Sequence, residues 1–294
     1  MSEGVQDAWV KRGIVGILGF LGLWVFWTAV LAHPVARLVE GIAPGVFPFP
    51  RIFGRVQLGV ALALVPLLLW YWRDHPKRFY DSRPWKIGLT QSLLWLVVGM
   101  GMVGVVAGLQ TWLGVRKWGG VPGVGLWAGF LATGCLVGVL EEFFFRGVLG
   151  MAWWKAMGNR PVGILLPVNA VLFSAVHFIR PLAGPEQGWV GGFAAWSRLE
   201  LWSGTVDLWR LAGLAVAGLI LARMVWGQGN LWAAMGLHAG WVAGVRWAEA
   251  CFPEVSQATP GWWGPSLESG PLMFLVLLLL AFSLMGKPIR AHLD

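Results

Sequence analysis

The sequence predicts an all-α fold: a polytopic membrane protein built as a bundle of about eight transmembrane helices. Of its 294 residues, 57% are apolar and only 12% are charged, and the mean hydropathy is +0.67. Soluble domains carry about 25% charged residues. Uncharged stretches long enough to cross ~30 Å of hydrocarbon, about 20 helical residues, recur along the chain. This composition, with only two cysteines, excludes a disordered chain, a collagen and a disulfide scaffold.

Eight apolar stretches follow one another, and each is interpreted as one helix. In order, they cover residues 13–32, 56–72, 87–115, 118–140, 161–178, 211–226, 231–247 and 271–285. A basic loop at 73–86 separates the second from the third. A turn at 158–161, with a glycine suited to end a helix and a proline suited to begin one, separates the fourth from the fifth. Gly227-Gln-Gly229 interrupts the helical pattern between the sixth and the seventh stretch.

The charges predict how these helices are oriented. The loop at 73–86 holds five Lys and Arg residues, which predicts that it faces the cytoplasm. Counting from it places both termini in the cytoplasm and the protein in the plasma (inner) membrane. The net charge of +8 is then a property of cytoplasmic loops, so we expect no nucleic-acid partner. An alternative is that 13–32 is a cleaved signal, since Val30-Leu-Ala32 resembles a processing site.

Three charged residues interrupt the apolar stretch 121–154. Glu141, Glu142 and Arg146 would each cost a few kcal/mol or more in contact with lipid, so they must face the bundle interior, a water cavity or each other. Glu142 and Arg146 are four residues apart on one helical face, which predicts an ion pair. Glu141 points about 100° away. An apolar environment disfavours a charged carboxylate and makes it a better proton acceptor, so Glu141 suits a general base.

Two histidines, His177 and His238, also lie inside apolar stretches. Glu141 is 18 residues before Asn159 in the turn and His177 is 18 residues after it, so both would lie ~27 Å from the turn in antiparallel helices. His238 would lie ~14 Å from the break at 227–229. The sequence therefore predicts that the glutamate and both histidines converge in the cytoplasmic half of the membrane.

The helix before His177 offers two further candidates. Asn169, Phe173 and His177 repeat at four-residue spacing and line one stripe, so the Asn169 amide would face the same cavity. A purely structural alternative also fits. In that interpretation the pair of Glu142 and Arg146 fixes the helix register, and the histidines satisfy backbone carbonyls.

Three motifs in this region carry a family resemblance. They are Glu141-Glu-Phe-Phe-Phe-Arg-Gly147, Phe173-Ser-Ala-Val-His177 and the segment 230–241 that contains His238. In this order they resemble the EExxxR, FxxxH and final-histidine motifs of the CAAX protease and bacteriocin-processing family of intramembrane endopeptidases, type II CAAX prenyl endopeptidases among them. The resemblance covers 118–247. We expect that region to be the catalytic core of a single transmembrane domain, 1–294.

The resemblance implies an intramembrane protease that depends on a glutamate. It assigns water activation to Glu141 and maps the two motif histidines to His177 and His238, with Glu142 and Arg146 in supporting positions. It implies a protein or peptide substrate, a lipid bilayer around the site and no cofactor or metal. It leaves the oligomeric state open. Many members carry Asn four residues after the last histidine, where this chain has Val242, so Asn169 or His238 would hold the oxyanion instead.

Other functions stay open on the sequence alone. Two histidines and a glutamate are a common catalytic zinc set, although HExxH is absent. A non-catalytic immunity or scaffold protein of the same fold is the alternative that Val242 favours. A proton-coupled transporter is less well supported, because no internal repeat with paired broken helices is visible.

Overall fold

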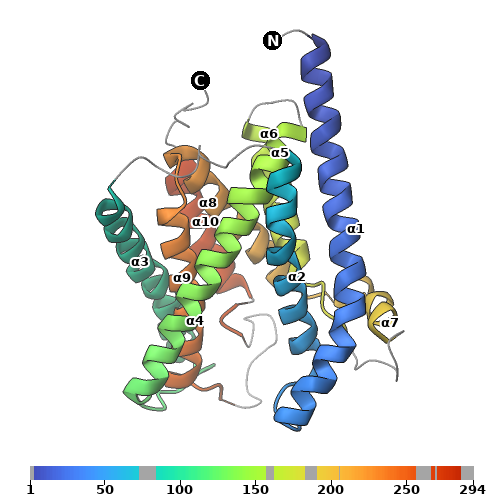
Figure 1. Cartoon of the computed structure of the whole chain (residues 1–294). Helices are drawn as coiled ribbons and strands as arrows, with labels where there is room; N and C mark the ends of the chain where they lie inside the picture. Colours follow the sequence, from blue (N-terminus) through green and yellow to red (C-terminus); the bar gives the residue numbers. More distant parts are fainter. Residues whose placement is uncertain are drawn as a thin grey trace. The chain divides into compact units, whose positions relative to one another are not determined.

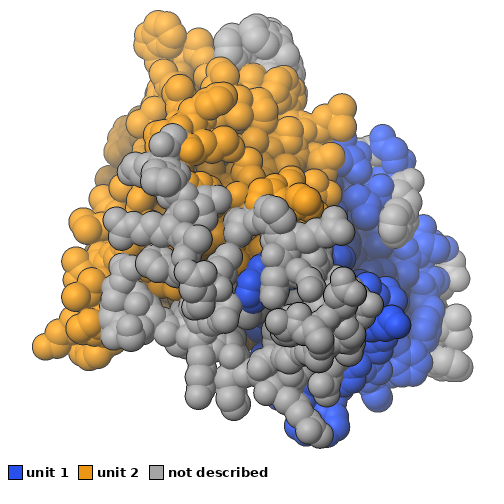
Figure 2. Space-filling view, turned by 90° about the horizontal axis from the view of Figure 1, so that it is seen from above, with its two compact units in different colours: residues 1–75, 148–161, 174–206 blue, residues 76–147, 162–173, 207–294 orange. Residues whose placement is uncertain are grey.

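The computed structural model describes residues 3–72, 84–156, 162–182, 191–204, 206–255, 266–268 and 270–285 (Figure 1). Its regular elements in these ranges are all helical, apart from two isolated bridges between Arg116 and Glu254 and between Pro181 and Leu199. The predicted all-α class is confirmed. Contacts divide the chain into two compact units, coloured separately in Figure 2. The first holds residues 1–75, 148–161 and 174–206, and the second holds 76–147, 162–173 and 207–294.

Every predicted apolar stretch contains a helix. These helices are α1 (Glu3–Ile42), α2 (Phe49–Trp72), α3 (Trp85–Trp112), α4 (Val124–Glu142), α6 (Val162–Val176), α8 (Leu208–Gln228), α9 (Trp232–Cys251) and α10 (Pro271–Met285). Shorter elements complete the described part of the chain: a π-helical turn (Phe143–Leu149), α5 (Gly150–Ala156), α7 (Gly191–Ser197) and a 3₁₀ turn (Glu200–Trp202).

Five of the helical stretches are long and apolar enough to cross a membrane. They are Gly13–Ile42, Phe49–Tyr71, Trp85–Trp112, Val124–Trp154 and Leu208–Gln228. Within the described residues, Gly163–Val176 and Pro271–Met285 are shorter apolar helices, and α9 carries Arg246 and Glu249 near its end. The chain is therefore an integral, multi-pass membrane protein.

Two predicted boundaries were wrong, at the end of the third stretch and the start of the fourth. The helix α3 ends at Trp112 rather than at residue 115, and α4 begins at Val124 rather than at 118. Gly114 and Gly120 adopt φ of 75° and 108°, a conformation that breaks a helix. The backbone between them pairs instead with the segment after α9, where the Lys117 N–H donates to the Pro253 carbonyl over 3.1 Å.

The first predicted helix is longer than expected, and two predicted connections fall outside the described residues. The first helix continues ten residues past residue 32, because hydropathy marks only the apolar part of a helix that continues through Arg37 and Glu40. The turn at 158–161 and residues 73–83 of the basic loop lie outside the described residues.

The first unit is organised around the hairpin of α1 and α2. Gly45, at φ 70°, lies in the turn between them. Aromatic and aliphatic side chains fill the space between these helices and α7, with Phe53 buried completely and its ring 5.6 Å from that of Trp196. A Cβ at Gly192 would overlap the Ala29 backbone, so α7 packs on α1 only because this position has no side chain.

The second unit is organised around α9, which packs closely against α3 and α4. Gly236, Gly240 and Gly244 repeat every four residues; a Cβ at Gly236 or Gly240 would collide with the α3 backbone, and one at Gly244 would lie 3.1 Å from Met100 Cα. Their neighbours Ser92, Leu96 and Met100 advance in the same direction, so α3 and α9 are parallel. Small residues let membrane helices approach to backbone contact, where dispersion and not water exclusion holds them together.

On another side of α9, α4 runs antiparallel through a second close contact. A Cβ at Gly134 would come within 2.5 Å of the Ala239 carbonyl oxygen, and one at Gly138 within 2.8 Å of the Met235 carbonyl oxygen. Gly138 is one helical turn before Glu142, and Ala239 directly follows His238. This crossing therefore brings the acidic end of α4 to the histidine of α9.

Two further helices of the second unit, α8 and α10, end at the same level as the start of α9. Gly229, at φ 70°, ends α8, and the Asn230 side chain accepts the Trp232 N–H over 3.1 Å to begin α9. The helices α8 and α10 are in contact and parallel, since Arg210 pairs with Glu268 at their starts and Gly213 lies beside Leu277 further along. The ends of α8 and α10 thus lie with the starts of α3 and α9.

Replacing Gly138 by Ala is expected to lower the free energy of unfolding by about 1–3 kcal/mol, because the new methyl group would press on backbone atoms that cannot move aside. Gly129, on the same helix with no atom near its Cβ position, is the matched control. There Ala should leave stability unchanged or raise it by up to about 1 kcal/mol. Thermal unfolding in detergent measures both, and equal effects at the two positions would contradict the close crossing.

Candidate active site

The acidic pair lies where α4 changes from an α-helix to a π-helical turn. Glu141 and Glu142 are the last two residues of α4, and Arg146 lies within the turn Phe143–Leu149. The sequence predicted a regular helix here. Single π-helical turns inserted in α-helices are frequent at functional sites, because the extra residue per turn redirects side chains.

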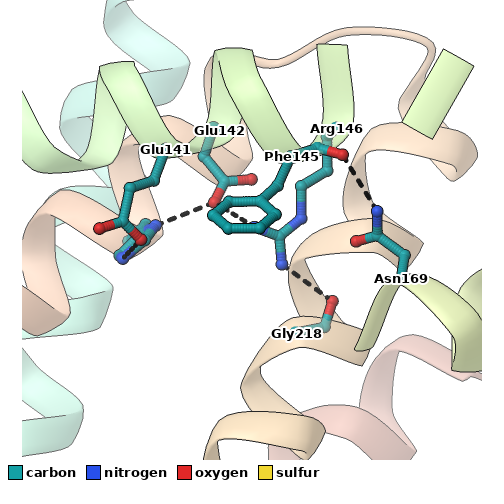
Figure 3. Close-up of polar contacts among 7 residues, drawn as sticks. Glu141, Glu142, Phe145, Arg146, Asn169 and Gly218 are labelled. Atoms are coloured by element: carbon teal, nitrogen blue, oxygen red, sulfur yellow. Dashed lines mark hydrogen bonds and ion pairs between the residues drawn. The ribbon is translucent and has the colours of Figure 1, made fainter. Parts of the chain in front are cut away.

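Glu142 is the centre of the polar network (Figure 3). Its Oε1 accepts a hydrogen bond from Nη1 of Arg146 at 2.8 Å and lies 2.9 Å from Nδ1 of His238. The side chains of Glu142 and Arg146 are both 0% exposed. The predicted ion pair is therefore present, and one carboxylate oxygen serves both the guanidinium and the imidazole.

The other ring nitrogen of His238 faces Glu141. Nε2 lies 3.8 Å from Oε2 of Glu141, too far for a direct hydrogen bond. The Glu141 side chain is 22% exposed, whereas that of Glu142 is completely buried. The two neighbouring carboxylates thus have different access to solvent and substrate.

The Phe173 ring packs against several members of this network. Its ring is 2% exposed and lies 4.3 Å from the Arg146 guanidinium, a cation–π distance. The same ring meets the edges of His238, at 5.7 Å between centroids, and of Phe145, at 5.4 Å. Nη2 of Arg146 also donates to the carbonyl of Gly218 on α8 over 3.2 Å (Figure 3). The arginine is therefore fixed by α4, α6 and α8 together.

Asn169 supports the π-helical turn rather than the space near Glu141. Its buried Nδ2 donates to the carbonyl of Phe145 over 3.0 Å (Figure 3). The bond satisfies a backbone acceptor in the turn that carries Arg146, and such acceptors are costly to leave unpaired in an apolar environment.

His177 is the predicted site residue that belongs to the first unit. It directly follows the end of α6, is half-buried, and its backbone N–H donates to the Ser174 carbonyl over 3.2 Å. Its convergence with Glu141 and His238 stays a prediction. Val242 lies one turn after His238 on α9 and is half-buried.

Sequence reasoning missed three features of the site: the π-helical turn, the contact of Glu142 with His238, and the Gly218 carbonyl that holds Arg146. The stripe of small residues around His238 was the available signal for the second. It indicated a helix buried on several sides, from which an imidazole would need a polar partner.

Comparison with known proteins gives one family match. Residues 123–244 match the family model of Rce1-like type II CAAX prenyl endopeptidases. This segment is CAAX protease-like. It covers 122 residues (244 − 123 + 1) of the 294 in the chain and contains every site residue described above. No curated protein and no solved structure matches the chain. Residues 123–244 are thus similar to peptidases of the CAAX protease type.

The buried ion pair gives a stability prediction. Arg146→Met should lower the free energy of unfolding by about 3–5 kcal/mol, because it leaves the Glu142 carboxylate buried without its cation. The control is Arg210→Gln, whose partner Glu268 is 52% exposed, where a change of about 0–1 kcal/mol is expected. Adding Glu142→Leu to Arg146→Met should recover part of the loss. Chemical denaturation in mixed micelles measures all three, and a harmless Arg146→Met would contradict the central role of the pair.

Proposed function

We propose that the protein is an intramembrane endopeptidase in which Glu141 activates a water molecule against a peptide carbonyl. The observation that carries this proposal is the 3.8 Å separation between Glu141 Oε2 and His238 Nε2, with Nδ1 of the same imidazole held by buried Glu142. A carboxylate that fixes one ring nitrogen fixes the direction of the other. Nε2 of His238 and the Glu141 carboxylate therefore face the same space.

The proposed reaction needs no covalent intermediate. A water donates one hydrogen bond to Glu141 and the other to Nε2 of neutral His238. Glu141 takes a proton as the water oxygen bonds to the scissile carbonyl carbon. We propose His177 as the oxyanion donor in place of Asn169 and His238, since Asn169 donates to the Phe145 carbonyl and His238 contacts Glu142 and the water. Glu141 then returns the proton to the amide nitrogen as the C–N bond breaks, which leaves a carboxylic acid and an amine, and the acid afterwards loses its proton to water. Arg146 and Glu142 hold His238 in place and take no part in proton transfer.

The different environments of the two glutamates support Glu141 as the base. Oε1 of Glu142 already interacts with two partners, and its side chain is 0% exposed. Glu141 is part-exposed on the neighbouring helical position. The same separation of roles was expected from the 100° angle between successive helical residues.

The depth of the site supports cleavage close to one membrane surface. His238 is six residues after Trp232, the first residue of α9, so it lies about 9 Å along the helix from that end. The starts of α3 and α9 lie together, and α3 follows the basic loop that predicts the cytoplasmic side. We propose that the substrate is the C-terminal tail of a prenylated CAAX protein that reaches the site from the cytoplasm at the plasma membrane.

Glu141→Gln is expected to lower the cleavage rate by about 10²–10⁴, the usual contribution of a general base. Because Glu141 is part-exposed, the variant should keep the wild-type thermal unfolding temperature. The assay is cleavage of a farnesylated CAAX peptide and of its unprenylated counterpart by the full chain in lipid vesicles. Glu249→Gln, on an exposed position of α9, is the matched control and should keep full activity. His238→Ala and His177→Ala should each lose most of the activity.

The same measurement separates a hydrolase from a binding protein. The half-buried Val242, where many relatives carry an oxyanion donor, favours the second candidate, a non-catalytic membrane immunity or scaffold protein. If wild-type and Glu141→Gln bind the CAAX peptide equally and neither cleaves it, the scaffold function is supported and the hydrolase rejected.

Chelation tests the remaining zinc variant. Among the described residues, no three His, Cys, Asp or Glu side chains are grouped to hold a metal ion. We expect the peptidase to keep its rate after incubation with 1,10-phenanthroline and dialysis, since a carboxylate can activate water without a Lewis acid. Loss of activity that returns with added Zn²⁺ would replace the mechanism above by a metal-dependent one.

A further inference from the structure

A cavity in the second unit lies between α6, α8 and α10. It has a volume of about 340 Å³, within the range of small-molecule sites. Most of its wall is aliphatic and comes from three helices, with Leu166 on α6, Leu219 and Ile220 on α8, and Leu284 and Met285 on α10. None of the site residues described above lines it. The cavity is therefore separate from the candidate active site.

Among the described residues that line this cavity, Arg223 is the one that carries a charge. It is only 8% exposed. A Cβ at Gly227, one helical turn after Arg223, would overlap the Arg223 guanidinium. The absence of a side chain at Gly227 therefore provides the space for this arginine. The guanidinium is therefore the one group in the described lining that is suited to bind an anion.

The position of the cavity along the helices matches a membrane–water boundary. Arg223 is five residues before Gln228, the last residue of α8, or about 7.5 Å from the helix end. Met285 is the last residue of α10, and Leu166 is in the second turn of α6. The α6 N-terminus adds partial positive charge at this level. One end of the cavity is therefore cationic and interfacial, and the rest is apolar.

We propose that this cavity binds one anionic phospholipid, with its phosphate on Arg223 and part of an acyl chain against α8 and α10. The planar guanidinium matches two phosphate oxygens. Basic pockets between membrane helices on the cytoplasmic side are suited to anionic headgroups. A zwitterionic lipid offers the same chain but no net charge. Binding here does not depend on hydrolysis at Glu141, so either proposal can fail without the other.

The test is native mass spectrometry of the full chain released from nanodiscs that contain equal amounts of phosphatidylglycerol and phosphatidylcholine. The wild type is expected to retain one phosphatidylglycerol in clear excess over phosphatidylcholine. Arg223→Gln should weaken that retention about fivefold, the factor equivalent to the roughly 1 kcal/mol that one basic residue contributes near an anionic surface. Arg223→Lys should keep most of it. Leu284→Trp, which fills the apolar part, should reduce retention of both lipids.

Arg210→Gln provides the matched control, because it removes the same charge from the opposite end of α8. It should retain phosphatidylglycerol like the wild type, and an equal loss would mean that net charge and not this cavity selects the lipid. Equal retention of both lipids by the wild type overturns the proposal even if Arg223→Gln fails to fold. Displacement of the lipid by millimolar inorganic phosphate would also overturn it, in favour of a free-phosphate site.

Discussion

A single carboxylate oxygen buried in the second unit links the charged residues of the candidate site. Oε1 of Glu142 lies 2.8 Å from Arg146 and 2.9 Å from His238, and neither acidic nor basic side chain of the ion pair reaches solvent. Two charges in so apolar an environment are stable only when they are paired and their remaining groups are hydrogen-bonded. The Gly218 carbonyl and the Phe173 ring meet part of that requirement for the guanidinium, whereas Nε of Arg146 and Oε2 of Glu142 have no hydrogen-bond partner among the described residues. The carboxylate in turn fixes the orientation of the imidazole.

This network depends on backbone contacts that involve no charge. Glycines at 134 and 138 on α4, and at 236, 240 and 244 on α9, let the helices approach until their backbones touch. Side chains as short as glutamate and histidine can meet across an interface only at such close range. The small residues of α9 therefore have two consequences: they hold α3, α4 and α9 together without a hydrophobic driving force, and they set the distance between His238 and the two glutamates.

The π-helical turn at 143–149 makes contacts with two different helices. It begins directly after the acidic pair. Arg146 within it pairs with Glu142 four residues back, and the Phe145 carbonyl accepts a hydrogen bond from the Asn169 amide. Such a turn has weaker backbone hydrogen bonding than an α-helix. Asn169 supplies one hydrogen bond to this turn, and Phe173, one helical turn on along α6, packs against Phe145 and Arg146. Asn169 and Phe173 therefore stabilise the segment that carries Arg146.

The sequence by itself determined the helices and the local pairs. Apolar runs located the helices, because the cost of exposing backbone and charge to lipid acts on each segment separately. The spacing of Glu142 and Arg146 predicted their ion pair, because both residues share one helix. Only the tertiary structure decided that the same carboxylate also holds His238, 96 residues away, and that Asn169 turns to the Phe145 carbonyl. Helical periodicity tells which face a residue occupies, but the partner on that face depends on how closely, and in which direction, another helix packs against it.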